Sequence, residues 1–145
     1  MRAAPAAIYL DASAILRLLF ATAGSKAPLS RFVSTSSRLV EVELFRALDR
    51  SRLAGQLDEL EAARKHRELS TLFGRLHLFP VGDEVIDAAR APLALPVSSL
   101  HALHAATARQ VLAESGSLHF WTHDRSQAAA AVTLGLEVRG VDAEV

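Results

Sequence analysis

Four residues with metal-binding or acid–base side chains are placed where a parallel α/β fold would bring them to one edge of its sheet. Asp11 and Asp124 each close a short apolar run, Glu43 lies early in an amphipathic segment, and His101 opens a further helical segment. An acid directly after a buried strand is rarely needed for folding. Two such acids with a helical glutamate and histidine indicate a divalent-metal site, and the chemistry that such a site favours is phosphodiester hydrolysis.

Both aspartates also have an ordinary structural explanation. Asp11 and Asp124 could cap the helices that follow them, and a side-chain cap stabilises a helix by about 1 kcal/mol. Ser13 could cap the first of these helices instead, and capping leaves unexplained why an acid closes the strand. The site interpretation is therefore favoured for Asp11, whereas the two interpretations of Asp124 are balanced.

Two glutamates compete for the helical acid of the site. Glu41 and Glu43 lie about 200° apart around a helix axis, so that only one can face a given site. Glu43 lies beside the apolar stripe that includes Leu39 and Ala47, which favours it. The alternative for either residue is a solvated side chain, the usual fate of a glutamate on a helix.

Two histidines, His101 and His104, are three residues apart and would lie near one face of a helix. Such a pair can form half of a transition-metal site. The chain has no cysteine and no second pair of soft ligands, so we expect no dedicated zinc site. Packing in the core or exposure at the surface is the more frequent role of a helical histidine.

Short apolar runs alternate with helical segments along the chain. Strands are expected at residues 6–10, 31–35, 76–80, 118–122 and 137–139, helices at 12–20, 36–52, 57–73, 83–90, 98–114 and 126–134, and a loop at 21–29. This alternation predicts a three-layer α/β/α sandwich with a four- to five-stranded, mainly parallel sheet. Sites in such sheets form beyond the carboxyl ends of the strands, where Asp11 and Asp124 would lie.

The composition limits the possible classes of protein. A length of 145 residues, half of them hydrophobic, fits a single globular domain over residues 1–145. The formal net charge of zero argues against strong non-specific nucleic-acid binding, but not against a nuclease whose metal ions supply positive charge. The absence of cysteine fits a cytoplasmic protein. Asp11 and Arg17 interrupt the only stretch like a signal peptide, and no apolar run approaches the roughly 20 residues that span a bilayer.

Three segments resemble the motifs of PIN-domain ribonucleases, specifically the toxins of VapBC-type toxin–antitoxin modules. Residues 9–15 (YLDASAI) are similar to the opening motif. Residues 37–47 are similar to the second motif, whose acid precedes Arg-Ala by three positions, and this resemblance selects Glu43. Residues 122–136 are similar to the closing motif. The order and spacing of the three segments make the combination specific.

A fourth segment departs from the family pattern. Residues 100–108 resemble the sequence Leu-Asp-Ala-Leu-His-Leu-Ala-Thr-Ala, with His101 at the position of the aspartate and His104 at that of the histidine. One carboxylate that the resemblance leads us to expect is therefore absent.

The resemblance implies a metal-dependent endoribonuclease, the toxin of a toxin–antitoxin system, in which a metal-activated water hydrolyses RNA. It implies the following roles: catalytic for Asp11, Glu43, His101 and Asp124; metal-binding (Mg²⁺ or Mn²⁺) for Asp11, Glu43 and Asp124; supporting for Ser13 and Thr122. Imidazole is a poorer ligand for Mg²⁺ than for Mn²⁺, so His101 predicts a relative preference for Mn²⁺. The implied partners are RNA, a cognate antitoxin and a second copy of the chain, without a membrane.

Two other interpretations stay open, and one class is excluded. His101 could mark a catalytically degenerate PIN-fold protein that only binds partners. A receiver-like signalling domain is disfavoured because Asp11 has no neighbouring acid and no lysine follows Lys65. A P-loop enzyme is excluded because no Gly-x-x-x-x-Gly-Lys occurs. The alanine-rich helices at 102–113 and 127–134 could offer surfaces to a partner, or could simply fill the core.

Overall fold

The computed structural model describes residues 6–21 and 32–141, and nearly all of the loop expected at residues 21–29 lies outside these ranges. The elements are β1 (Ala7–Leu10), α1 (Ala12–Leu19), β2 (Val33–Ser37), α2 (Leu39–Leu53), α3 (Glu59–Phe73), β3 (His77–Phe79), α4 (Asp83–Ala89), α5 (Ser99–Ser115), β4 (Leu118–Trp121), α6 (Arg125–Thr133) and β5 (Glu137–Arg139). Their order and types are those that the sequence predicts. No helix among the described residues is long and apolar enough to cross a membrane.

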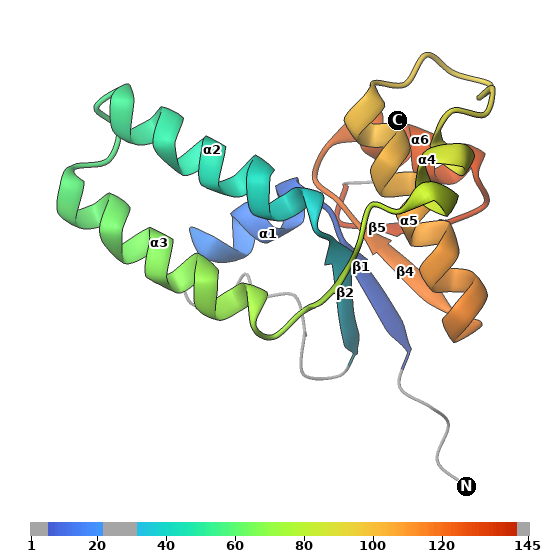
Figure 1. Cartoon of the computed structure of the whole chain (residues 1–145), viewed down its shortest axis with the longest axis horizontal. Helices are drawn as coiled ribbons and strands as arrows, with labels where there is room; N and C mark the ends of the chain where they lie inside the picture. Colours follow the sequence, from blue (N-terminus) through green and yellow to red (C-terminus); the bar gives the residue numbers. More distant parts are fainter. Residues whose placement is uncertain (1–5, 22–31, 142–145) are drawn as a thin grey trace, which may run out of the picture.

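The five strands form one sheet with the order β3-β2-β1-β4-β5, and every neighbouring pair is parallel. The first strand lies at the centre, where Tyr9 pairs with Thr35 on one side and with Phe120 on the other. Figure 1 shows the helices lying on the two sides of this sheet. The predicted α/β/α sandwich with a parallel sheet is confirmed.

Alternate residues of β1 serve two different cores. Ile8 and Leu10 belong to the cluster formed with α1, α2 and α3. Ala7 and Tyr9 belong to the cluster formed with α5, β4 and α6. Because side chains alternate between the faces of a strand, four residues buried in succession require a layer of helices on each face.

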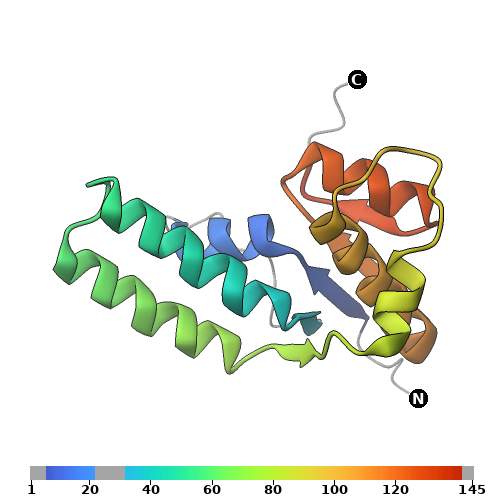
Figure 2. The same cartoon turned by 45° about the horizontal axis from the view of Figure 1, so that its top comes forward.

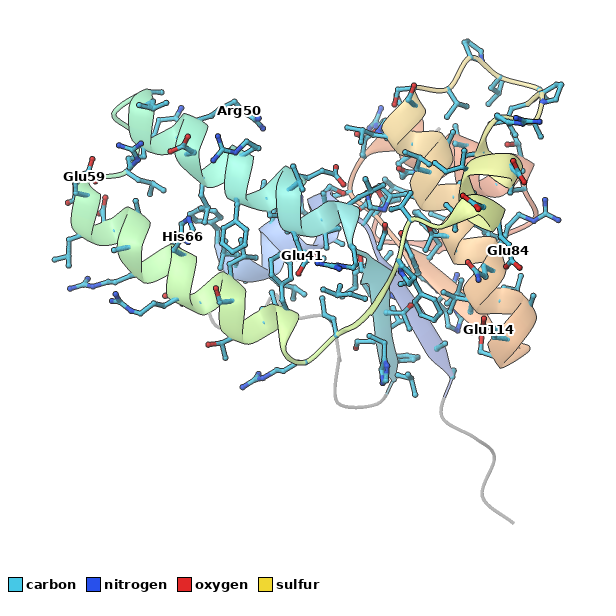
Figure 3. All side chains as sticks on the ribbon, viewed as in Figure 1. Glu41, Arg50, Glu59, His66, Glu84 and Glu114 are labelled. Carbon is cyan, nitrogen blue, oxygen red and sulfur yellow. The ribbon has the colours of Figure 1, made fainter. Side chains whose placement is uncertain are left out.

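The helices α2 and α3 run side by side as an antiparallel pair that extends away from the sheet (Figures 1 and 2). A capping box begins α3, because Asp58 accepts a hydrogen bond from the backbone of Glu61 and the Glu61 side chain accepts one from the backbone of Asp58. Between the helices, His66 stacks on Phe45 with ring centroids 4.4 Å apart (Figure 3). Glu43 lies in the first half of α2, close to the end of β2 from which the hairpin leaves.

The strand β2 is polar in sequence (VSTSS) yet four of its five residues are buried. Its hydroxyl groups bond to the backbone of the neighbouring strand: Thr35 donates to the carbonyl of Ile8 and Ser36 to that of Leu10. Ser37 accepts a hydrogen bond from the backbone N–H of Leu39. The strand therefore continues to Ser37, two residues beyond its predicted end, and the helix begins later than expected.

The alanine-rich helices pack mainly within the chain. In α5 and α6 the buried alanines are Ala102, Ala105, Ala106, Ala108, Ala128, Ala130 and Ala131. Small side chains allow the helices to approach the sheet and each other closely, so core packing accounts for this composition.

The C-terminus of α5 supplies a test of backbone strain. Gly116 caps this helix with a φ of 77°, and a Cβ added there would meet nothing within 4 Å. We expect Gly116→Ala to lower the free energy of unfolding by about 1 kcal/mol, since only the left-handed backbone conformation opposes a side chain. Gly116→Asn should cost less, because asparagine adopts this conformation more readily. Chemical denaturation measures both, and equal losses would contradict the explanation.

Candidate active site

Asp11 directly follows the central strand, and its carboxylate is only 3% exposed. Oδ1 accepts hydrogen bonds from Ser13 Oγ at 2.7 Å and from the backbone N–H of Ala14 at 3.0 Å. Oδ2 accepts one from the hydroxyl of Thr122. The backbone bond caps α1. Asp11 is therefore a helix cap, and it also lies at the sheet edge where the site was expected.

Ser13 and Thr122 link the turn after β1 to the turn after β4. Ser13 Oγ accepts the backbone N–H of His123 at 2.8 Å while donating to Asp11. Thr122 Oγ1 accepts the backbone N–H of Asp124 at 3.0 Å while donating to Asp11. Each hydroxyl thus uses both its donor and its acceptor capacity. The supporting contacts predicted for Ser13 and Thr122 converge on the carboxylate of Asp11.

Asp124 caps α6 and faces His101. Its Oδ1 accepts the backbone N–H groups of Ser126 at 2.8 Å and Gln127 at 3.1 Å. Its Oδ2 lies 3.3 Å from Nε2 of His101. The Asp124 side chain is 40% exposed, which leaves this pair within reach of solvent. The predicted helix cap is thus present, and it coexists with a contact to a second predicted site residue.

The two glutamates of α2 have separate partners. Glu43 Oε1 lies 2.6 Å from Nε2 of His104. Glu41, labelled in Figure 3, instead accepts a hydrogen bond at 2.9 Å from the guanidinium of Arg38, the residue just before α2. Of the two, Glu43 is the glutamate that reaches α5.

Two residues outside the predicted set of site residues, Tyr9 and His104, connect to Glu43 through hydrogen bonds. The Tyr9 hydroxyl lies 2.7 Å from Nδ1 of His104, and both side chains are almost completely buried. Burial raises the pKa of Tyr9 well above its ordinary value, and the negative field of Asp11 and, to a smaller extent, of Glu43 adds to this shift. Tyr9 therefore keeps its proton. Its hydroxyl lies within the electric field of the carboxylates of Asp11 and Glu43.

The sequence offered one partial signal for this arrangement. The three-residue spacing of His101 and His104 predicts a shared helix face, and both side chains do reach carboxylates, Asp124 and Glu43 respectively. The contact with Tyr9 joins residues 95 positions apart and has no local sequence signal.

The first turn of α5 is tied to α6. Gln127 donates from its side-chain amide to the carbonyl of His101 at 3.1 Å. Its own carbonyl oxygen, Oε1, is buried without a hydrogen-bond partner among the described residues. The contact fixes the backbone of His101 relative to Asp124, which begins α6.

The donor types suit a hard divalent cation, because carboxylate oxygens are the protein ligands that Mg²⁺ and Mn²⁺ prefer. The described residues contain no group of three or more histidine, aspartate or glutamate side chains placed to hold one ion together. The arrangement instead pairs Asp124 with His101 and Glu43 with His104, with Asp11 between hydroxyl donors. A cation bound here would therefore need water molecules among its ligands, as is common for Mg²⁺.

The hydroxyl of Thr122 can be tested by its removal. In Thr122→Val the buried carboxylate of Asp11 loses a donor, and the backbone N–H of Asp124 loses an acceptor. We expect the free energy of unfolding to fall by about 1–3 kcal/mol, measured by chemical denaturation.

Thr133→Val is the matched control. Thr133 is exposed on α6 and donates only to the carbonyl of Ala130, so its change should stay within about 0.5 kcal/mol. Equal losses at the two threonines would show that the Asp11 contact adds no stability.

Comparison with known proteins yields consistent matches. The PIN domain sequence model matches residues 8–133. Ribonuclease VapC46 of Mycobacterium tuberculosis is 37% identical over 138 residues, covering 92% of this chain and 96% of that protein.

Solved structures share the fold at lower identity. VapBC2 of Rickettsia felis, bound to a DNA fragment from its promoter, superposes with a TM-score of 0.66 at 15% identity, over 93% of this chain and 99% of that one. PAE2754 of Pyrobaculum aerophilum gives 0.63 at 21% identity, over 92% and 83%. VapC20 of Mycobacterium tuberculosis, a toxin that cleaves the sarcin–ricin loop, gives 0.56 at 19% identity, over 86% and 95%.

Proposed function

The chain belongs to the PIN-domain family, and we propose that it is a VapC-type toxin, a metal-dependent endoribonuclease with a cognate antitoxin. The observation that carries the proposal is the buried carboxylate of Asp11 at the carboxyl edge of the central strand, held by Ser13 and Thr122 from two different turns. The 37% identity of this chain to a ribonuclease, over nearly its whole length, supports the reaction class. The resemblance in sequence motifs is thereby confirmed at the level of the family.

The residues proposed to hold the cation are Asp11, Glu43 and Asp124, partly through water. Mg²⁺ or Mn²⁺ bound there would supply positive charge to the RNA phosphate and lower the pKa of a nearby water. The chain's own contribution is positioning: the hydroxyls of Ser13 and Thr122 fix Asp11, while the backbone of α6 fixes Asp124. The negative charge of three carboxylates along this edge of the sheet favours a cation over an anion in this region.

His101 is proposed to take part in the site as a hydrogen-bond donor to Asp124 rather than as an anionic ligand. The 3.3 Å approach of Nε2 to Oδ2 supports this role. Compared with an aspartate at position 101, the imidazole removes one negative charge, which weakens the attraction for Mg²⁺ more than for Mn²⁺. The competing proposal is that histidine at position 101 has abolished the activity. The chain would then be a PIN-fold protein that binds its partners but does not cleave RNA.

The proposed partners follow from the family. An antitoxin would need an apolar surface, and the hairpin of α2 and α3 exposes large hydrophobic side chains at Val42, Leu53 and Leu60. RNA as the substrate, a homodimer and a cytoplasmic location are parts of the same proposal.

Metal-dependent RNA cleavage is the first test. Purified chain without antitoxin should cut RNA with Mn²⁺ or Mg²⁺ and should stop when EDTA removes the ion. Asp11→Asn should lower the rate by at least about 100-fold, because it removes the charge of the central carboxylate. Asp87→Asn is the matched control, since Asp87 is exposed on α4. Cleavage by Asp11→Asn at the wild-type rate would refute the assigned site.

The choice of metal tests His101. We expect His101→Asp to raise Mg²⁺-supported cleavage relative to Mn²⁺-supported cleavage, because the substitution restores a carboxylate. Rates with the two ions at equal concentration give the ratio. If the wild-type chain is inactive with both ions and His101→Asp restores cleavage, the degenerate alternative is correct. An unchanged ratio would remove His101 from the metal proposal.

A further inference from the structure

A buried chain of hydrogen bonds runs from the central strand to the site edge. It begins at Tyr9 in β1, passes through His104 in α5 and ends at Glu43 in α2. We propose that Tyr9 and His104 are positioning residues that hold the carboxylate of Glu43: Tyr9 fixes the tautomer of His104, and His104 then donates to one oxygen of Glu43. This inference rests on the proposed function for its effect on metal binding, and on the hydrogen-bond geometry alone for the tautomer.

The first step concerns the proton of Tyr9. The side chain is fully buried, and burial favours the neutral phenol over the charged phenolate. The nearby hydroxyls of Ser36 and Thr107 donate to the backbone carbonyls of Leu10 and Leu103. The Tyr9 hydroxyl has its hydrogen bond with Nδ1 of His104, at 2.7 Å. On the other side of the ring, Nε2 faces the carboxylate of Glu43, which can only accept, so in a neutral imidazole Nδ1 is the acceptor and Tyr9 the donor.

The second step follows from the chemistry of imidazole. A neutral ring whose Nδ1 accepts a hydrogen bond carries its proton on Nε2. Nε2 lies 2.6 Å from Oε1 of Glu43, a distance typical of a strong hydrogen bond to a charged acceptor. The opposite tautomer would place a nitrogen lone pair against the carboxylate. Tyr9 and Glu43 therefore favour the same tautomer, and the Tyr9 hydroxyl adds to the preference for the ring that binds Glu43.

The third step is the consequence for Glu43. A glutamate on a helix has considerable rotamer freedom, and its side chain here is 21% exposed. His104 is 2% exposed and meets Tyr9 edge to face, with ring centroids 5.9 Å apart. This rigid imidazole engages Oε1, whereas Oε2 has no hydrogen bond among the described residues. The carboxylate is thus fixed through one oxygen, and the other is available to a cation or its water.

The same contact joins the two helical layers. The helix of Glu43 contributes to the core on one face of the sheet, and Ala108 and Val111 of α5 contribute to the core on the other. Both layers pack on the same sheet, and the bond between His104 and Glu43 adds a direct link between them. Second-sphere contacts of this kind typically change metal affinity by about 10–100-fold when removed.

The experiment combines a tautomer measurement with a metal titration. Long-range ¹H–¹⁵N spectra of the wild-type chain should show His104 protonated on Nε2, with the signals assigned by their loss in His104→Gln. In Tyr9→Phe the ring loses its donor to Nδ1 while Nε2 still faces Glu43, and the spectra should show a smaller fraction of the Nε2-protonated tautomer than in the wild type. Calorimetric titration with Mn²⁺ should give an affinity about tenfold lower for Tyr9→Phe than for the wild type.

His104→Gln separates positioning from a merely structural role. The glutamine amide can still donate to Glu43. Because an amide has no second tautomer, this hydrogen bond does not require Tyr9 to orient the donor. Mn²⁺ affinity should therefore stay within about threefold of the wild type in His104→Gln, and adding Tyr9→Phe to it should cause little further loss. His104→Leu, which cannot donate, should lose about tenfold. Thermal unfolding of each variant identifies any that has lost its fold.

Two results would overturn the inference: an Nδ1-protonated His104 in the wild type, or a Tyr9→Phe variant that is folded and binds Mn²⁺ as tightly as the wild type. Failure of the proposed function looks different. A wild-type chain that neither binds Mn²⁺ nor cleaves RNA removes the nuclease proposal. The tautomer of His104 and its response to Tyr9→Phe would still decide whether Tyr9 and His104 position Glu43.

Discussion

A carboxylate buried to 3% exposure has to be hydrogen-bonded, and much of the site's structure follows from meeting this requirement at Asp11. Its donors are the hydroxyl of Ser13, the backbone of Ala14 and the hydroxyl of Thr122. The first two belong to the start of α1 and the third to the turn after β4. The hydrogen bonds to this one carboxylate therefore bring together the turn after β1 and the turn after β4, which lie more than 100 residues apart in the sequence.

The helix α5 extends this organisation to the other carboxylates. Two histidines one turn apart on its first half reach Asp124 at the start of α6 and Glu43 on α2. A helix whose N-terminus lies beyond the ends of the strands can contact both flanking elements without distorting the sheet. The acids of the site are consequently placed through contacts with α5 as much as through the sheet.

Several parts of the fold could be predicted from sequence because local physics determines them. Apolar runs closed by Asp11 and Asp124 marked two strand ends correctly, and both aspartates cap the following helices as their residue type favours. The end of β2 was misplaced because Ser36 and Ser37 look like helix caps locally. The Ser36 hydroxyl instead donates to the backbone of Leu10 in the neighbouring strand, while Ser37, still in β2, accepts the N–H of Leu39, the first residue of α2. The pairing of β2 with its neighbouring strands therefore decided whether these two serines continue the strand or begin the helix.

The contacts of the site were less accessible to sequence reasoning. Helix geometry showed that Glu41 and Glu43 face different directions, but not which of them faces α5. Which glutamate faces α5 depends on how α2 packs relative to α5, and this packing is determined by the fold of the whole chain. The same holds for Tyr9, since a tyrosine in a buried strand predicts core packing and gives no indication of a partner 95 residues away.

Helix capping also determines how this site can drift during evolution. Asp11 and Asp124 each cap the N-terminus of a helix, so a chain that no longer needed its chemistry would still gain stability from a capping side chain such as aspartate, asparagine or serine at both positions. Position 101 is exempt, because Ser98 caps α5 and accepts the backbone N–H of His101. The side chain of His101 itself does not cap a helix. Helix capping therefore does not restrict the side chain at position 101, which leaves its chemistry free to change.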